Sequence, residues 1–345
     1  MSDEKLIRLT GMLPEEISEA LSLKAGFRGK QIFKWIASGV ESFDEMTNLS
    51  KDMRVDLSER ATLRSTTISE KLEDPDGTIK LQIRLFDGMC VETVLLTDAD
   101  GRKTACVSCQ VGCAMGCAFC QTGKLGFARN LTADEIVEQF LHLEKICGTL
   151  DNIVFMGMGE PMLNLGAIRK AIAVLTSAEG RALSPRRITI STSGVIKGIY
   201  DLADNGPAVR LAISLTAANP DLRTKLMPVN KANPLPELSK AIGYYIEKTG
   251  KRCTLEAALL GGVNTDAESA RFMKEFAGTL PVHINLIPWN PVEGLPYHEP
   301  TTKECRAYIQ MLENYGLQVT QRTRRGRKIG GACGQLGKTC KTTAD

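Results

Sequence analysis

Histidine is scarce in this sequence: the chain of 345 residues contains 3 histidines (His142, His283 and His298) against 11 cysteines. So few imidazoles argue against a His-based metal site and against a Ser-His-Asp triad. Aromatic residues are also few, at 5%, while hydrophobic residues make up 43% and charged residues 24% of the chain. This is the composition of an ordinary soluble globular protein, and it excludes a largely disordered chain.

Long apolar runs and a secretory leader are missing as well. No run approaches the roughly 18 consecutive apolar residues of a membrane-spanning helix. The first residues, Met1–Lys5, are polar and carry no basic n-region followed by an apolar stretch. We therefore expect a cytosolic protein, in which this many cysteines indicates metal or redox chemistry rather than a disulfide scaffold.

Charge is spread unevenly along the chain. The formal net charge is +3, yet the segment from residue 316 to residue 345 has seven basic residues and one acidic residue, so the remainder is slightly acidic. A basic end of this kind fits a nucleic-acid partner and fits equally a solvated charged tail. Charge alone leaves both interpretations open.

The hydrophobic periodicity changes twice along the chain. It predicts helices over Pro14–Leu23, Gly29–Ala37 and Lys51–Arg60, the last capped by Ser50. A hairpin is predicted next, with strands over residues 79–85 and 89–96. Strands and helices then alternate about six times, which predicts a parallel sheet with outer helices, open or closed as a barrel. The predicted strands are 153–156, 187–191, 209–215, 253–260, 282–287 and 317–323, and the helices are 132–147, 165–177, 195–205, 236–249, 266–278 and 302–315.

The sharpest local signal is a run of three cysteines, Cys113-x3-Cys117-x2-Cys120. A 4Fe–4S cluster can take three thiolates and leave its fourth iron open for chemistry. The alternative is a structural zinc ribbon, in which Cys106 and Cys109 join Cys117 and Cys120. The ribbon has an unusually short gap between its two cysteine pairs and leaves Cys113 without a role.

Several motifs, together with Phe119 before the third cysteine, resemble one family along nearly the whole chain. It is the RlmN/Cfr family of dual-cysteine RNA methyltransferases, which belongs to the radical S-adenosylmethionine (SAM) superfamily and acts on adenosine. The motifs span residues 106–113, 126–132, 157–161, 184–187, 285–291 and 332–336. The resemblance implies an α/β fold, a partial (βα)6 TIM-like radical SAM barrel with a small helical N-terminal domain and a basic C-terminal tail. The implied domains are a helical RNA-binding domain (1–75), a β-hairpin extension (76–98), the radical SAM core (99–325) and the tail (326–345).

The resemblance also implies the cofactors and the residues that hold them. Cys113, Cys117 and Cys120 are expected to hold one 4Fe–4S cluster, whose open iron binds SAM, and two SAM molecules are expected per turnover. The positions expected to contact SAM are Gly159, Glu160, Ser191, Ser214, Leu215, Thr216 and Asn290. The family usually has histidine in place of Thr216, so this chain departs from the family at that contact.

Three further residues are implied to carry the reaction. Cys333 matches the cysteine that accepts a methyl group, becoming S-methylcysteine, and passes its carbon to the adenine ring. Cys106 matches the cysteine that resolves the resulting protein–RNA adduct through a transient disulfide with Cys333. Glu92 matches the acceptor of the ring proton. Just before Cys333 the family usually has an acidic pair, whereas this chain has Arg327 and Lys328.

The partners implied are 23S rRNA, with tRNA as a further substrate in some members, and an electron donor of flavodoxin type. The motifs look more like the group that methylates carbon 2 than the group of the Cfr type that methylates carbon 8. Candidate RNA-facing residues are those of the basic tail together with Lys24, Arg28, Lys30 and Lys34. Two alternatives stay open: a radical SAM enzyme with another substrate, and a non-catalytic zinc-ribbon RNA-binding protein.

Overall fold

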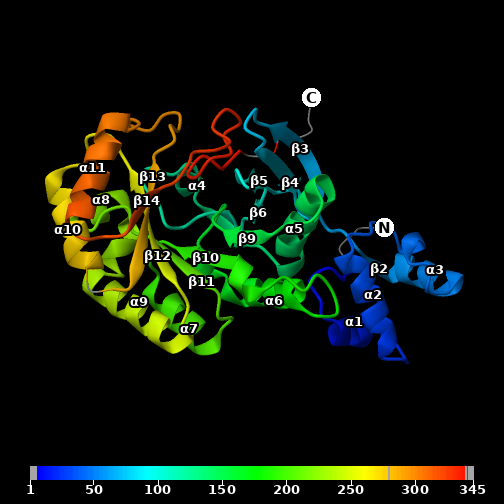
Figure 1. Cartoon of the computed structure of the whole chain (residues 1–345). Coiled ribbons are helices and arrows are strands. Elements are labelled where there is room, and N and C mark those ends of the chain that lie inside the picture. Colours follow the sequence, from blue (N-terminus) through cyan, green and yellow to red (C-terminus); the bar gives the residue numbers. More distant parts are fainter. Residues whose placement is uncertain (1–5, 279, 339, 341–345) are drawn as a thin grey trace.

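A small helical region forms one end of the molecule, at the right of Figure 1. The computed structural model describes residues 6–278, 280–338 and 340, so Lys341 and Asp345 of the predicted basic tail lie outside the described residues. Its elements are β1 (Ile7–Arg8), α1 (Pro14–Ala20), α2 (Phe27–Ala37), a 3-10 turn (Phe43–Glu45), α3 (Lys51–Arg60) and β2 (Ala61–Thr62), which pairs with β1. The three predicted helices are confirmed, and the Ser50 hydroxyl accepts the Met53 N–H at 3.3 Å as a cap.

One ten-stranded sheet dominates the rest of the chain. Its order is β14-β13-β12-β11-β10-β9-β6-β5-β4-β3, parallel from β14 to β6 and antiparallel from β6 to β3. The strands are β3 (Thr67–Glu73), β4 (Ile79–Arg84), β5 (Cys90–Thr97), β6 (Lys103–Cys106), β9 (Asn152–Phe155), β10 (Ile188–Thr192), β11 (Arg210–Ser214), β12 (Cys253–Leu259), β13 (Val282–Pro288) and β14 (Val319–Gln321). The predicted hairpin corresponds to β4 and β5.

Helices cover the outer face of the parallel strands (Figure 1). They are α5 (Ala133–Cys147), α6 (Leu165–Thr176), α7 (Ile196–Asn205), α8 (Pro220–Leu226), α9 (Leu235–Thr249), α10 (Ala267–Ala277) and α11 (Thr302–Asn314). The predicted α/β partial barrel with outer helices is therefore confirmed. Among the described helices, none is long and apolar enough to cross a bilayer.

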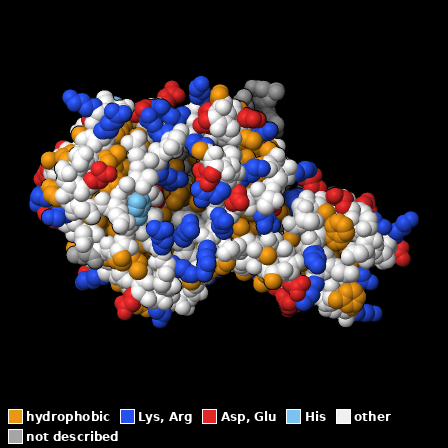
Figure 2. All heavy atoms as spheres, in the orientation of Figure 1, with side chains coloured by type: hydrophobic (Ala, Val, Ile, Leu, Met, Phe, Trp, Pro, Cys, Tyr) orange, Lys and Arg blue, Asp and Glu red, His pale blue; other side chains and the backbone are white. Residues whose placement is uncertain are grey.

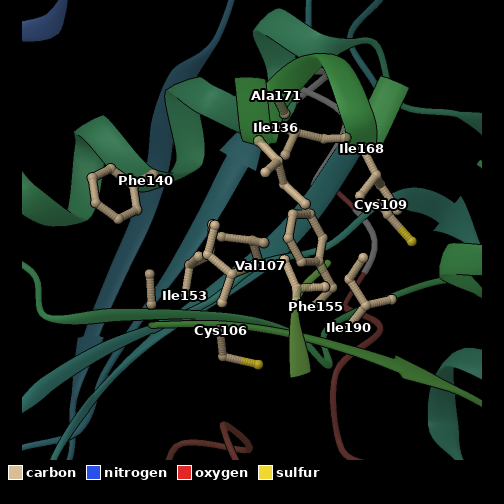
Figure 3. Close-up of a cluster of buried hydrophobic side chains, with 14 of the residues drawn as sticks. Cys106, Val107, Cys109, Ile136, Phe140, Ile153, Phe155, Ile168, Ala171 and Ile190 are labelled. Carbon is tan, nitrogen blue, oxygen red and sulfur yellow. The ribbon is translucent and has the colours of Figure 1, made fainter. Parts of the chain in front are cut away.

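The hydrophobic core lies between the strands and these helices. Figure 3 shows Val107, Ile153 and Phe155 pointing from the sheet toward Ile136 and Phe140 of α5. Cys106 precedes Val107, and its side chain points to the opposite side of the strands in the same view. Neighbouring residues of an extended chain face opposite sides, so this alternation directs the Cys106 thiol away from α5 and toward the inside of the barrel.

Several elements were not predicted, among them the short strands β1, β2 and β6. Strand β3 has no buried position, and its sequence lacks the apolar alternation that indicates a strand. Helix α8 is 7 residues long, too short to show a helical period. The strands β7 (Gln110–Gly112) and β8 (Phe127–Asn130) form a separate pair that surrounds the three-cysteine run.

The tail crosses from β14 back to the hairpin sheet, as the red ribbon shows in Figure 1. Two aspartates in the β3–β4 turn receive its first part, because the Gly326 N–H donates to Asp76 at 2.8 Å and the Lys328 N–H donates to Asp74 at 2.9 Å. In the family, an acidic pair usually stands in the tail itself, just before the cysteine that corresponds to Cys333. Here the two carboxylates belong instead to the β3–β4 turn. They place negative charge beside the basic stretch that replaces that pair.

Candidate active site

The three-cysteine run forms a loop between β7 and α4 (Gln121–Lys124). The loop starts at Gly112, whose φ is +73° and where a Cβ atom would come within 1.9 Å of the Gly126 carbonyl oxygen. Only glycine fits at such a point. The next residue is held in the same place, since the Cys113 N–H donates to the Gly126 carbonyl at 2.7 Å.

All three cysteines of the loop line one cavity inside the barrel, here called the central cavity. Burial raises the pKa of Cys113 to about 11 and also raises the pKa of Cys117. Among the described residues, no three His, Cys, Asp or Glu side chains are arranged to hold a single metal ion. Three thiols on the wall of one cavity are the donor set that a 4Fe–4S cluster with one open iron would take.

The zinc-ribbon alternative does not fit this arrangement. Cys106 points into the barrel, whereas Cys109 is labelled on the core side of the sheet, near Ile168 of α6 (Figure 3). Cys109 is 2% exposed, and burial raises the pKa of its thiol well above the ordinary value. Cys106 therefore faces the inside of the barrel, whereas Cys109 faces the packed helices outside it. Two thiols on opposite sides of the sheet do not form one tetrahedral zinc site with Cys117 and Cys120.

Most of the positions expected to contact SAM line the central cavity together with the three cysteines. They are Gly159, Glu160, Ser191, Ser214, Thr216 and Asn290, which lie at the carboxyl ends of parallel strands or a few residues beyond them. Leu215 is the exception, because it is fully buried and is not among the residues that line the cavity. Thr216, where the family has histidine, adopts a positive φ of 56°.

Glu160 is buried at the wall of this cavity, at 3% exposure. Its carboxylate accepts the N–H and the hydroxyl of Ser193, each at 2.7 Å, and the N–H of Met162 at 3.0 Å. Burial nevertheless raises the pKa of Glu160 above its ordinary value, against the hydrogen bonds from Ser193. A cationic group bound in the cavity would therefore favour the ionised carboxylate.

Arg223, on α8, is a cation that the sequence motifs did not indicate. It is fully buried, donates to the Ser193 carbonyl at 2.7 Å and to the Ser214 carbonyl at 3.2 Å, and also contacts the Leu215 carbonyl. Burial lowers its pKa to about 10, with Cys117 acting in the opposite direction. Arg223 thus ties together the backbone of two strand ends behind the predicted SAM contacts.

A second cavity, here called the tail cavity, lies beside the first. Cys106 and Cys333 both line it, and Cys333 also lines the central cavity. Cys106 is 7% exposed, Cys333 is exposed, and both thiols are free. The Asn290 amide donates to the Cys333 carbonyl at 3.3 Å, which links the tail to a predicted SAM contact.

Glu92 lines neither cavity and is fully buried below the tail. Its Oε1 atom lies 2.8 Å from the Lys80 Nζ atom, and its Oε2 atom accepts the N–H groups of Gly337 at 2.6 Å and Lys338 at 3.1 Å. The predicted proton acceptor is therefore covered by the tail in this conformation. Residues 337–338 lie between this carboxylate and the solvent side of the tail.

A disulfide joins Cys90 of β5 to Cys340 of the tail, with their Cα atoms 5.5 Å apart. That separation is ordinary for a disulfide. The sequence did not indicate this pair, whose members lie 250 residues apart. The bond attaches the tail to the hairpin sheet beyond the residues that cover Glu92.

A parallel barrel with a three-cysteine loop and polar strand ends around one cavity defines a radical SAM protein, and the family model of the "Radical SAM superfamily" matches residues 107–273. A second family model, "Ribosomal RNA large subunit methyltransferase N-terminal domain", matches residues 19–63. The chain is 61% identical to the "Probable dual-specificity RNA methyltransferase RlmN" of Treponema denticola, over 96% of this chain and 95% of that protein. The protein of the same name from Treponema pallidum is 55% identical, over 96% of this chain and 97% of its own length.

Among solved structures, a radical SAM methyltransferase from Sphaerobacter thermophilus superposes with a TM-score of 0.92 at 40% identity, covering 96% of this chain and 99% of that one. The chain belongs to the RlmN family. The family resemblance inferred from the sequence motifs is thereby confirmed.

Proposed function

We propose that this protein is a radical SAM methyltransferase that methylates carbon 2 of an adenosine in 23S rRNA and also acts on tRNA. The observation that carries the proposal is the position of Cys333, which borders the cavity of the three-cysteine loop and the cavity of Cys106. A residue that carries a methyl group from SAM to RNA needs access to both. The name of the relatives, which describes a dual-specificity RNA methyltransferase, supports the choice of RNA.

The central cavity supplies the binding steps of this reaction. Cys113, Cys117 and Cys120, which line this cavity, would hold one 4Fe–4S cluster, and the polar strand ends, with Glu160 foremost, would orient SAM beside it. When bound, the cluster supplies the electron that starts radical chemistry on a second SAM molecule. We expect a flavodoxin-type protein to deliver that electron.

The residues on the tail side carry the methyl group and release the product. The Cys333 sulfur accepts the methyl group of the first SAM, and its carbon then becomes bonded to the adenine ring. Glu92 accepts the ring proton once residues 337–338 uncover it. Cys106, whose thiol faces the tail cavity, then bonds to the Cys333 sulfur and frees the RNA.

The proposal also assigns the N-terminal region to RNA binding, with its helical part ending before β3, because Thr67–Glu73 belongs to the large sheet. Lys24, Lys30 and Lys34 are exposed there, and Phe27 is 56% exposed beside them. Figure 2 shows further Lys and Arg side chains around the hollow in the middle of the molecule. Positive charge next to exposed aromatic rings suits a folded RNA from which one base must be extruded.

The test is nucleoside analysis of a 23S rRNA fragment after anaerobic incubation with reconstituted protein, SAM and a reductant. We expect 2-methyladenosine from the wild type and none from Cys333→Ala, while Cys147→Ser, at the end of α5, matches the wild type. 8-Methyladenosine would contradict the assignment of carbon 2. Full activity of Cys333→Ala would contradict the whole proposal.

A further inference from the structure

Some residues line both the central cavity and the tail cavity and so form the boundary between them. Among the described residues of this boundary, one has a charged side chain. Five residues are shared: Met156, Ile287, Asn290, Arg322 and Cys333. Arg322 follows directly after β14, and the family motifs gave it no role. Arg322 therefore borders the same two cavities as Cys333, which is expected to react with SAM in the central cavity and with Cys106 in the tail cavity.

Arg322 is fixed in this position by the sheet and by a buried carboxylate. The backbone N–H of Arg322 donates to the Leu286 carbonyl at 2.9 Å. In its side chain, the Nη1 atom lies 3.5 Å from Glu256 Oε2 and 3.8 Å from the sulfur of Met156. Glu256, on β12, is 6% exposed. Arg322 is thus held by β12, by β13 and by the residue that follows β9.

Glu256 is itself held by its neighbours. The Asn285 amide donates to its Oε1 atom at 2.8 Å and the Thr254 hydroxyl at 3.0 Å. Within the described residues, its Oε2 atom has no hydrogen-bond partner. The carboxylate therefore has one oxygen left to anchor Arg322.

The sulfur atoms near Arg322 need a cation if they are to react as thiolates. Burial and the nearby Cys333 raise the pKa of Cys106 to about 12, while Arg322 acts in the opposite direction. Arg322 is itself half-buried, which lowers its pKa, yet the neighbouring Cys333, Glu256 and Cys106 raise its pKa above the ordinary value. A thiolate, not a thiol, is the nucleophile in methyl transfer and in disulfide formation.

We propose that Arg322, anchored by Glu256, is a positioning residue that stabilises the thiolates of Cys333 and Cys106. In the methyl-accepting step, the Cys333 thiol releases its proton to water. Its sulfur then forms a bond to the methyl carbon as the bond from that carbon to the SAM sulfonium breaks, so that S-adenosylhomocysteine leaves. The inference rests on the proposed function, because only that function requires both thiols to become nucleophiles.

The other charged and titratable groups around the two thiols are less well placed for this task. Arg324 and Arg325 line the tail cavity, but Arg324 pairs with Glu299 and Arg325 contacts the Thr97 carbonyl. Asp98 in the tail cavity adds negative charge, which disfavours a thiolate. On the other side, the titratable groups of the central cavity are Glu160, Glu256, Cys113, Cys117 and Cys120.

The test measures thiol reactivity directly, in reconstituted holoenzyme without RNA. The rate of Cys333 alkylation by iodoacetamide, followed by peptide mass, is recorded against pH for wild type, Arg322→Gln and Arg322→Lys. We expect the reaction of Arg322→Gln to be about tenfold slower at pH 7 and its profile to move to higher pH, with Arg322→Lys in between. Arg324→Gln, which removes a cation from the tail cavity alone, is expected to match the wild type.

A second readout is the rate at which Cys333 gains a methyl group from SAM in one turnover, which should fall by a similar factor in Arg322→Gln. Glu256→Gln leaves Arg322 in place but weakens its anchor, and a severalfold slower alkylation is expected. Equal alkylation profiles for wild type, Arg322→Gln and Glu256→Gln would overturn the inference. Wild-type protein whose Cys333 gains no methyl group would instead contradict the proposed function, while the alkylation profiles still decide the role of Arg322.

Discussion

The cysteines of this chain differ in their surroundings, and the differences match different tasks. Cys253 and Cys305 are buried in the core, at 2% and 3% exposure, and their raised pKa values follow from that burial. Such thiols are chemically inert. Cys333 is exposed at the meeting point of two cavities, which is where a cysteine that has to reach two different substrates should lie.

Replacing Cys106 tests the division of work within the cysteine pair. Because Cys106 is proposed to free the RNA from Cys333, Cys106→Ala should form the adduct and fail to release it. We expect a covalent protein–RNA species on denaturing gels, with Cys333 as the attached residue by peptide mass. Absence of that species in Cys106→Ala, with normal methylated product, would show that Cys106 has no resolving role.

Replacing Gly159 tests the wall of the central cavity. Its φ is +103°, and a Cβ atom there would come within 2.5 Å of Gln110 Cβ. Gly159→Ala should therefore cost about 1–3 kcal/mol of strain and displace Glu160 from the cavity wall. We expect SAM affinity, measured by equilibrium binding to the holoenzyme, to fall about tenfold, whereas Gly166→Ala on α6, with open space around it, should leave it unchanged.

At the scale of elements, the tail is held on two sides of the cavity mouth. The Thr122 hydroxyl donates to the Leu336 carbonyl at 2.6 Å and the Gln121 N–H donates to the Gly334 carbonyl at 2.8 Å, so α4 holds the segment beside Cys333. The hairpin strands hold the segment after it through Glu92 and the Cys90–Cys340 disulfide. Movement of the tail toward RNA has to break the second set of contacts.

Removing the disulfide should release the end of the tail. In Cys340→Ser, the contacts of Gly337 and Lys338 with Glu92 lose their covalent support, so we expect trypsin to cleave after Lys338 several times faster than in wild type. A reductant should give the wild type the same sensitivity, whereas Cys147→Ser should behave as the oxidised wild type. Equal cleavage rates with and without the disulfide would show that the other tail contacts suffice.

The sequence predicted the elements that carry a strong period and missed those that do not. The helix from Thr132 has an apolar stripe and a Glu135 carboxylate that accepts the Thr132 N–H at 3.0 Å, and its boundaries were predicted well. Strand β3 has only exposed or half-buried positions. It is an edge strand that contributes backbone hydrogen bonds to β4 and little apolar burial. Local periodicity carries no information about such an edge strand.

The same limit applies to the site. Motifs indicated the three-cysteine loop, Glu160 and Cys333, since these residues stand in recognisable local patterns. Arg223, Arg322 and the Cys90–Cys340 bond depend on contacts between segments distant in the chain, and no local pattern identifies them. They are the residues that three-dimensional structure adds to the account.

At the scale of the whole molecule, the helical region is anchored to the barrel through a buried carboxylate. Glu138 of α5 accepts the N–H of Ser65 at 3.0 Å and the N–H and hydroxyl of Thr66 at 2.9 and 2.6 Å. Burial raises the pKa of Glu138 to about 7, against these hydrogen bonds. The segment that leaves α3 is thus fixed on the barrel, and α1–α3 project from its side (Figure 1).

The projecting helices should contribute to RNA affinity through charge. Reversing two exposed lysines, in Lys24→Glu with Lys34→Glu, should weaken binding of the rRNA fragment about tenfold or more at low salt and reduce the dependence of affinity on salt. Lys240→Glu, on α9 of the barrel, is the matched control. Unchanged affinity and salt dependence in the double variant would place the RNA on another face.

The most direct test of the account follows the methyl group from Cys333 to RNA. Protein whose Cys333 carries a trideuterated methyl group is isolated, freed of SAM, and given unlabelled SAM, reductant and the rRNA fragment for a single turnover. The account predicts that the first 2-methyladenosine formed carries two deuterium atoms, because one is removed when the S-methyl carbon becomes reactive. A first product without deuterium would contradict it, since the methyl group would then have reached RNA without passing through Cys333.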